Sequence, residues 1–126
     1  MTRPGLPVLA LAGGLPAAAA GAAAVNPAAD CAALWLGYGD YAGISAFLDG
    51  QQEAYDTAAL FRSAAIRENG DAQAVDAHIA KVRHDMALMV EAHVELADPQ
   101  SRDLFERFSQ TCQDLADSLP EFQDPQ

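Results

Sequence analysis

Basic side chains are scarce in this sequence. Of its 126 residues, 7 are Lys or Arg and 18 are Asp or Glu, which gives a formal charge of −11 at pH 7. Proteins that bind nucleic acid or anionic lipid use basic side chains to displace the counterions of the phosphates. The composition therefore argues against a nucleic-acid partner and predicts a soluble protein that repels other anions.

The sequence also lacks the short motifs of common catalytic and cofactor sites. It contains no phosphate-binding loop, no dinucleotide fingerprint and no G-x-S-x-G turn. Neither the H-E-x-x-H zinc spacing nor the C-x-x-C and C-x-x-C-H motifs of redox and haem proteins occur. Its carboxylates are numerous but dispersed, as on the surfaces of helices. We therefore predict that the protein is not an enzyme and needs no cofactor.

Patterns typical of β-strands are missing as well, and helical periodicity dominates after residue 25. The sequence predicts an all-α fold, a small bundle of about four helices in residues 25–119, followed by a loose tail over 120–126. Alanine supplies 28 residues, which limits the volume of the core. A bundle of roughly 100 residues buries only about two thirds of its unfolded surface, so additional stabilisation is expected.

Four segments carry the helical pattern. The first follows Asn26-Pro27 and runs towards Leu48, although glycines at 37, 39 and 43 interrupt it. Either the helix breaks at these glycines, or another backbone packs closely against them. The second runs from about Gln51 to Glu68, and its inner face combines Ala54, Ala58, Phe61 and Ala65.

The third and fourth segments have sharper boundaries. Residues 72–97 show a 4-3-4-3 apolar alternation that predicts a long helix packed at a shallow angle, with Val75, Ile79, Val82, Met86, Met89, His93 and Leu96 inside. Asp98-Pro99 predicts the capped start of the last helix. Its buried stripe is predicted to contain Leu104, Phe105, Phe108, Cys112, Leu115 and Leu119.

The N-terminal residues 1–24 are typical of a secretory signal peptide. Arg3 precedes an apolar stretch over 6–15, and an alanine-rich run ends at Ala24 with small residues suited to cleavage. The alternative is an Ala/Pro/Gly-rich tail on a cytosolic protein. We expect export to the periplasm or beyond the cell, with a mature chain that begins near Val25 and does not insert into a membrane.

The two cysteines, Cys31 and Cys112, agree with export. An even number of cysteines in a short exported protein favours a disulfide, here between the first and last helices. Closing a loop of roughly 80 residues would stabilise the fold by about 4 kcal/mol in the chain-entropy model. The alternative is a pair of free thiols that only fill space.

Aromatic residues concentrate in the first helical segment. Trp35, the only tryptophan, lies near Tyr38 and Tyr41, and Asp40 lies among these rings. Together with the nearby glycines, these four residues form the candidate ligand-binding site, with Asp40 as its polar contact. The alternative is a tight helix crossing packed by aromatic side chains.

The three histidines, at 78, 84 and 93, all fall in the third segment. Met86, Met89 and His93 form a weak candidate set for copper or for an axial haem ligand. The alternative is methionine packing beside one hydrogen-bonded histidine. A second set, His84, Glu91 and Glu95, shares a polar face that is also explained as a solvated helix surface.

These observations lead to three functional hypotheses. The first is a non-enzymatic protein-interaction or chaperone-like accessory factor with a protein partner whose identity the sequence does not give. The second is a metal or haem carrier, and the third is a small-molecule or peptide binder at the Trp/Tyr/Gly-rich first helix. In its profile (small, acidic, exported, helical, two cysteines) the chain is similar to periplasmic acid-stress chaperones. Their cysteines lie much closer together in sequence, so this similarity transfers no residue.

Overall fold

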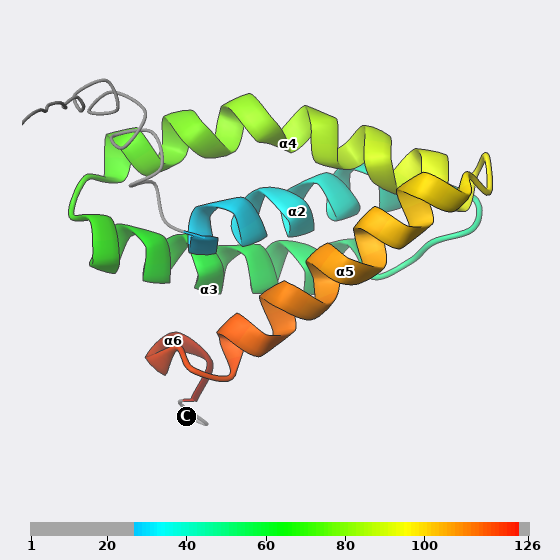
Figure 1. The fold of residues 1–126 in the computed structure, drawn as a ribbon. Coiled ribbons are helices and arrows are strands. Elements are labelled where there is room, and N and C mark those ends of the chain that lie inside the picture. Colours follow the sequence, from blue (N-terminus) through cyan, green and yellow to red (C-terminus); the bar gives the residue numbers. More distant parts are fainter. Residues whose placement is uncertain (1–26, 124–126) are drawn as a thin grey trace, which may run out of the picture.

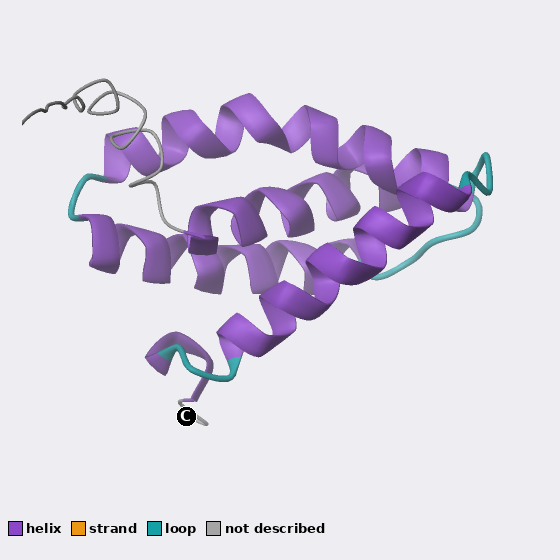
Figure 2. Ribbon diagram, in the orientation of Figure 1, coloured by secondary structure: helices purple, strands orange, loops and turns teal. Residues whose placement is uncertain are grey.

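The computed structural model describes residues 27–123, and within them every regular element is a helix (Figure 2). Four of these helices are long and one is short: α2 (Pro27–Ala42), α3 (Gln51–Asn69), α4 (Ala72–Val94), α5 (Pro99–Ala116) and α6 (Pro120–Gln123). The all-α bundle predicted from the sequence is confirmed. The predicted signal peptide over 1–24 lies outside the described residues.

Helix α2 is the centre of the bundle. Figure 1 shows it between α3 and α4, while α5 crosses the other helices diagonally. The backbone of α5 packs mainly against α4 and more lightly against α2, and it hardly approaches α3. None of the described helices has the length and apolar character needed to cross a membrane.

Small side chains allow α2 to occupy this position. Four alanines on α2 are fully buried, at positions 28, 29, 32 and 33, together with Leu34. At Gly37 the backbones of α2 and α4 nearly touch, because a Cβ atom there would lie 2.6 Å from the backbone nitrogen of Ala87. Of the two explanations for the glycines, close packing is therefore correct at Gly37.

The first helix is shorter than the sequence predicts. It continues through Gly37 and Gly39 but ends at Ala42, so Ile44 and Leu48 lie beyond it, and Ile44 is 84% exposed. In the connection to α3, Gly50 has a φ of +87°, a conformation that favours glycine. The chain turns here because α3 must return alongside α2.

Helix ends elsewhere follow the sequence signals. Gly70, with a φ of +83°, closes α3 by donating its N–H to the carbonyl of Ile66. The side chains of Asp71 and Asp98 accept hydrogen bonds from the backbone nitrogens at the starts of α4 and α5, at 3.1 and 2.8 Å. Pro99 occupies the first turn of α5, as predicted.

Leu96 and Leu104, near the turn between α4 and α5, are predicted to be buried but are exposed. Helix α4 ends at Val94, before residue 97, and Leu96 beyond its end is 70% exposed. Leu104 is half exposed on α5, whereas Val90, outside the predicted stripe, is fully buried. Because α5 leaves at an angle, the heptad pattern of α4 holds only as far as His93.

Residues 120–123 do not form part of the loose tail that the sequence predicts. They form the short helix α6, and the ring of Phe122 packs on Phe61 with centroids 4.6 Å apart. Arg67 on α3 donates hydrogen bonds to Glu121 at 2.7 and 3.0 Å, which holds α6 against α3. Residues 124–126 lie outside the described part of the chain.

A disulfide joins α2 to α5, as predicted. Cys31 and Cys112 are both buried, their Cα atoms are 5.7 Å apart, and 81 positions separate them in sequence. Because α5 has few backbone contacts with α2 and α3, this covalent bond is its principal attachment to the centre of the bundle.

Replacing both cysteines by serine is expected to lower the free energy of unfolding by about 4 kcal/mol, the loop-closure value for this separation. Urea denaturation followed by circular dichroism measures the change. In reductant, the wild type should have the same urea midpoint as the double variant. Reductant should not change the midpoint of the double variant. An unchanged midpoint for reduced wild type would contradict this role of the bridge.

Gly37→Ala is expected to lower the free energy of unfolding by about 1 to 3 kcal/mol, the usual cost of overpacking. The new methyl group meets backbone atoms of α4, which cannot move aside. Gly43→Ala is the matched control, because its methyl group meets the end of the flexible Gln51 side chain. Equal midpoints for the two variants in urea would show that α2 and α4 tolerate separation.

Candidate functional site

Aromatic rings from three helices meet on one side of α2. Trp35 and Tyr38 have ring centroids 5.3 Å apart, and Phe105 of α5 lies 6.4 Å from Trp35 and 6.1 Å from Tyr38. The imidazole of His93 on α4 stacks on the ring of Phe105, with the two ring centroids 5.3 Å apart. Phe105 therefore contacts residues of two separate candidate sites, Trp35 and Tyr38 of the ligand-binding set and His93 of the metal set.

Beside this cluster, two adjoining cavities lie along α3, the first facing α2 and the second facing α5. The first lies where α2 faces the start of α3, has a volume of about 500 Å³ and is lined by Trp35, Tyr38, Asp49, Gly50, Glu53, Ala54 and Thr57. The second, also of about 500 Å³, lies between α3 and the end of α5, with Phe61, Cys112, Ala116 and Phe122 as its apolar lining. Both are open to solvent and share Trp35 and Thr57, so we call them together the α3/α5 groove.

The second cavity exists because α5 crosses the bundle obliquely (Figure 1). Where two helix backbones diverge, the side chains of the helix beneath them remain accessible. Trp35 lies at this point and is only partly buried, although the alanines before it in α2 are fully covered. The sequence reason is a change on α2 from small to large side chains after Ala33.

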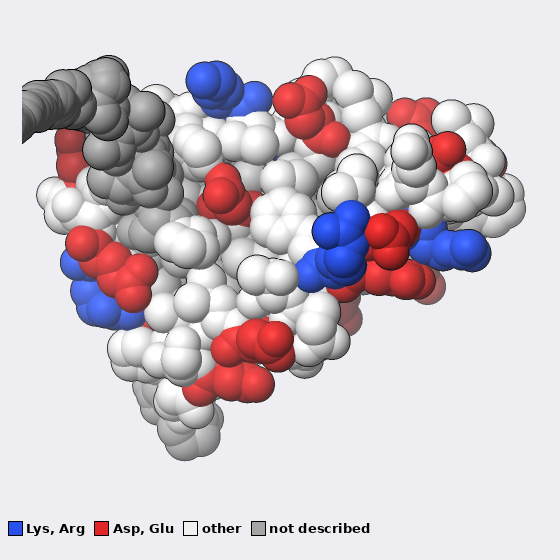
Figure 3. Space-filling model, in the orientation of Figure 1, with Lys and Arg blue, Asp and Glu red and all other residues white. Residues whose placement is uncertain are grey.

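Acidic side chains border the groove. Asp49 and Glu53 line the first cavity and Asp117 lines the second, and among the described residues neither cavity is lined by Lys, Arg or His. Figure 3 shows the face that carries α5: acidic side chains without basic neighbours lie over the C-terminal half of this helix, whereas acidic and basic side chains lie side by side over its N-terminal half. The groove thus combines an aromatic floor with negative charge.

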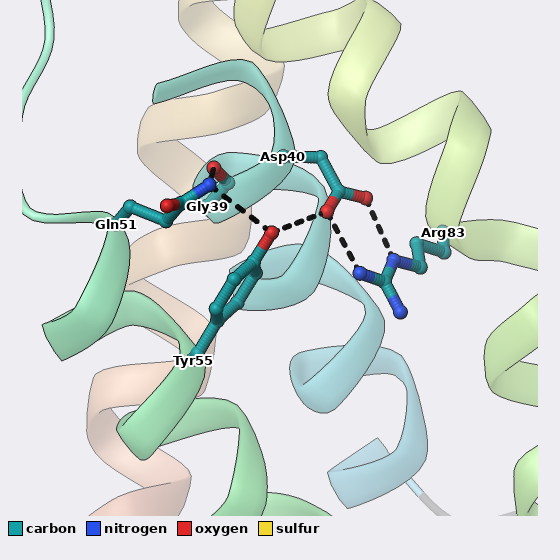
Figure 4. A network of polar contacts seen from close by, with 5 residues as sticks. All are labelled: Gly39, Asp40, Gln51, Tyr55 and Arg83. Atoms are coloured by element: carbon teal, nitrogen blue, oxygen red, sulfur yellow. Dashed lines mark hydrogen bonds and ion pairs between the residues drawn. The ribbon is translucent and has the colours of Figure 1, made fainter. Parts of the chain in front are cut away.

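Asp40 has a different role in the structure from the one suggested by its sequence context. Its carboxylate accepts hydrogen bonds from Arg83 at 2.6 and 2.7 Å and from the hydroxyl of Tyr55 at 2.7 Å (Figure 4). Gln51 donates to the carbonyl of Gly39 and to the Tyr55 hydroxyl. At 100° per residue, Asp40 lies about 140° around α2 from Trp35, so the two do not share a face.

This network joins α2, α3 and α4. The hydrogen bonds from Arg83 hold the pKa of the Asp40 carboxyl below its ordinary value, although burial opposes the shift. The hydrogen bond to Asp40 raises the pKa of Tyr55. The charges of Asp40 and Arg83 are already paired with each other, which suits a structural role more than contact with a ligand.

Tyr41 is also committed to an internal contact. Its side chain is nearly buried, and its hydroxyl donates to Glu95 at 2.5 Å, an interaction that raises the pKa of Tyr41. Of the four candidate ligand-binding residues, the structure therefore brings Trp35 and Tyr38 to the groove and places Asp40 and Tyr41 elsewhere.

Two of the candidate metal ligands, Met86 and Met89, are partly buried and pack against the core. Met86 packs against Gly37 and His93 stacks on Phe105, with the Nδ1 atom of His93 buried and without a hydrogen-bond partner in the described part of the chain. Within residues 27–123, no group of three or more His, Cys, Asp or Glu side chains could hold a metal ion. Of the second set, His84 and Glu91 line a small cavity of about 220 Å³, and Glu95 is bonded to Tyr41.

Sequence reasoning missed the groove residues on α3 and α6. Thr57 and Glu53 read as ordinary surface positions of a helix, and Phe122 was assigned to a loose tail. Phe122 was the one available signal, because an isolated aromatic residue in a polar segment usually has a packing partner.

No protein family, curated protein or solved structure matches this chain.

Asp40→Asn is expected to lower the free energy of unfolding by about 1 to 3 kcal/mol at pH 7, because it removes a carboxylate that accepts three hydrogen bonds. Asp76→Asn, at the exposed ion pair with Arg62, is the control and should cost under about 1 kcal/mol. Chemical denaturation at a series of pH values measures both.

The cost of Asp40→Asn should also depend on pH. A carboxyl whose folded pKa is depressed contributes stability above its unfolded pKa, and that contribution disappears as the pH falls through the folded pKa. The difference between wild type and Asp40→Asn should therefore be constant from about pH 5 to 7 and shrink below about pH 4. A difference that persists unchanged at pH 2 would mean that the carboxylate charge is not responsible.

Proposed function

We propose that this chain is an exported, non-enzymatic interaction factor that binds a segment of a partner protein in the α3/α5 groove. The observation that carries the proposal is the partly exposed Trp35 at the junction of two open cavities along α3, the second of which lies between α3 and α5, two helices whose backbones hardly approach each other. Aromatic anchors in such positions dominate the energetics of protein interfaces. The same surface would serve a chaperone-like factor that holds exposed segments of its clients.

The form of the groove favours a polypeptide over a compact small molecule. Small-molecule sites enclose most of the ligand surface, whereas here two adjoining cavities of about 500 Å³ each open to solvent along α3. An extended segment or one turn of helix fits such a surface lengthwise. The disulfide and α6 fix the walls, which lowers the entropic cost of binding.

Export is part of the proposal. It is supported by the signal-like residues 1–24 and by the Cys31–Cys112 disulfide, since such bonds persist in oxidising compartments. The acidic composition suits a partner segment without negative charge.

Thr57→Arg tests the site, because Thr57 lines both cavities and is not part of the buried core. An array of random decapeptides is probed with wild type, with this variant and with Ala59→Arg, which adds the same charge to an exposed position of α3 outside the groove. We expect wild type and Ala59→Arg to bind a common set of peptides and Thr57→Arg to lose at least about tenfold in affinity for them. Absence of binding by wild type, or equal binding by all three, would overturn the proposal.

A further inference from the structure

We propose that the α3/α5 groove binds two nearby side chains of its partner in two chemically different cavities. A Lys or Arg side chain lies against Trp35 between Asp49 and Glu53, and a large apolar side chain lies towards Phe61 and Phe122. This inference rests on the proposed function and specifies the chemistry of the bound segment.

The first cavity has the features that recognise an organic cation. Two aromatic side chains, Trp35 and Tyr38, line it, and a cation over the face of an aromatic ring is attracted by the ring quadrupole. Asp49 and Glu53 supply two carboxylates, and within the described residues neither forms a hydrogen bond or an ion pair. The other polar side chain of this cavity, Thr57, carries no charge, so a cationic ligand meets two carboxylates and no basic side chain in the cavity lining.

The second cavity has different chemistry. Its inner lining is apolar: Ala116 and Phe122 are partly exposed, and the buried Phe61 and Cys112 lie behind them. Ser109, Gln113, Asp117 and Gln123 surround this surface and can satisfy the backbone of a bound segment. A large apolar side chain buries the most surface here, and the carboxylate of Asp117 disfavours an acidic one.

The shared residues Trp35 and Thr57 connect the two cavities. Because both cavities include them, one short segment reaches the two cavities with side chains close in sequence. Its cationic residue points towards the connection before α3, and its apolar residue points towards α6. The two positions follow from chain topology, since Asp49 lies just before α3, Glu53 lies in its first turn and Phe61 lies about two turns after Glu53.

Synthetic octapeptides test this arrangement. Each has a neutral Gly/Ser/Ala background with one Lys and one Leu at a separation of two, three or four residues, in both orders. Matched peptides carry norleucine or Glu in place of Lys, or Ala in place of Leu. Calorimetry measures the dissociation constants, and the fluorescence of Trp35, the only tryptophan, reports whether binding occurs at the groove.

The best Lys/Leu peptide should bind about three- to tenfold more tightly than its norleucine counterpart, the gain expected of two partly exposed ion pairs and a cation–π contact. The Glu peptide should bind more weakly than either. In the double variant Asp49→Asn/Glu53→Gln, the Lys and norleucine peptides should bind equally. Asp85→Asn/Glu106→Gln, which neutralises two exposed carboxylates outside the groove, should preserve the preference.

The outcomes separate this inference from the proposed function. If Lys, norleucine and Glu peptides bind equally at Trp35, the charge reading is wrong and the groove still binds polypeptide. If a preference for Lys survives Asp49→Asn/Glu53→Gln, the cation lies elsewhere and the inference is wrong. If none of the octapeptides binds while the random array yields peptides blocked by Thr57→Arg, only this inference fails, and if neither set binds, both proposals fail.

Discussion

The small size of the side chains on α2 is the constraint on which the rest of the fold depends. A helix surrounded by three others must allow their backbones to approach, and alanine or glycine at the contact positions makes this possible. At Gly37 the approach to α4 reaches the limit set by backbone atoms. The cost is a core of limited volume, because buried alanines remove little apolar surface from water. Covalent and polar links therefore supplement the apolar contacts between helices.

The candidate site is a result of how those links are distributed. Helices α2, α3 and α4 are joined by packing and by the network around Asp40, whereas α5 depends on α4, on the disulfide and on the contact of α6 with α3. A helix held at a few points leaves space along its length. In this chain the space lies over the largest aromatic side chain of α2, which turns a loosely packed region into a groove with a defined floor.

The sequence predicted the helices and the disulfide better than the candidate site. Periodicity, caps and the cysteine count were sufficient for the all-α bundle, for the starts of α4 and α5, and for the Cys31–Cys112 bond. They were not sufficient for Asp40 and Trp35, which are close in sequence but lie on different faces of α2. Which helix covers which face depends on crossing angles, and these follow from all the contacts together. The exposed Leu96 and the buried Val90 were misassigned for the same reason.

The position of the disulfide has a consequence for resistance to proteolysis. Residues 31–112 form a covalent ring that contains the connections between α2 and α3, between α3 and α4, and between α4 and α5. Exposed connections of this kind are the usual sites of proteolytic cleavage. A single cut in any of the three leaves both products attached through the sulfur atoms and held together by the remaining helix contacts. The nicked molecule keeps its two pieces at high effective concentration, so one cleavage is not sufficient to disperse the fold.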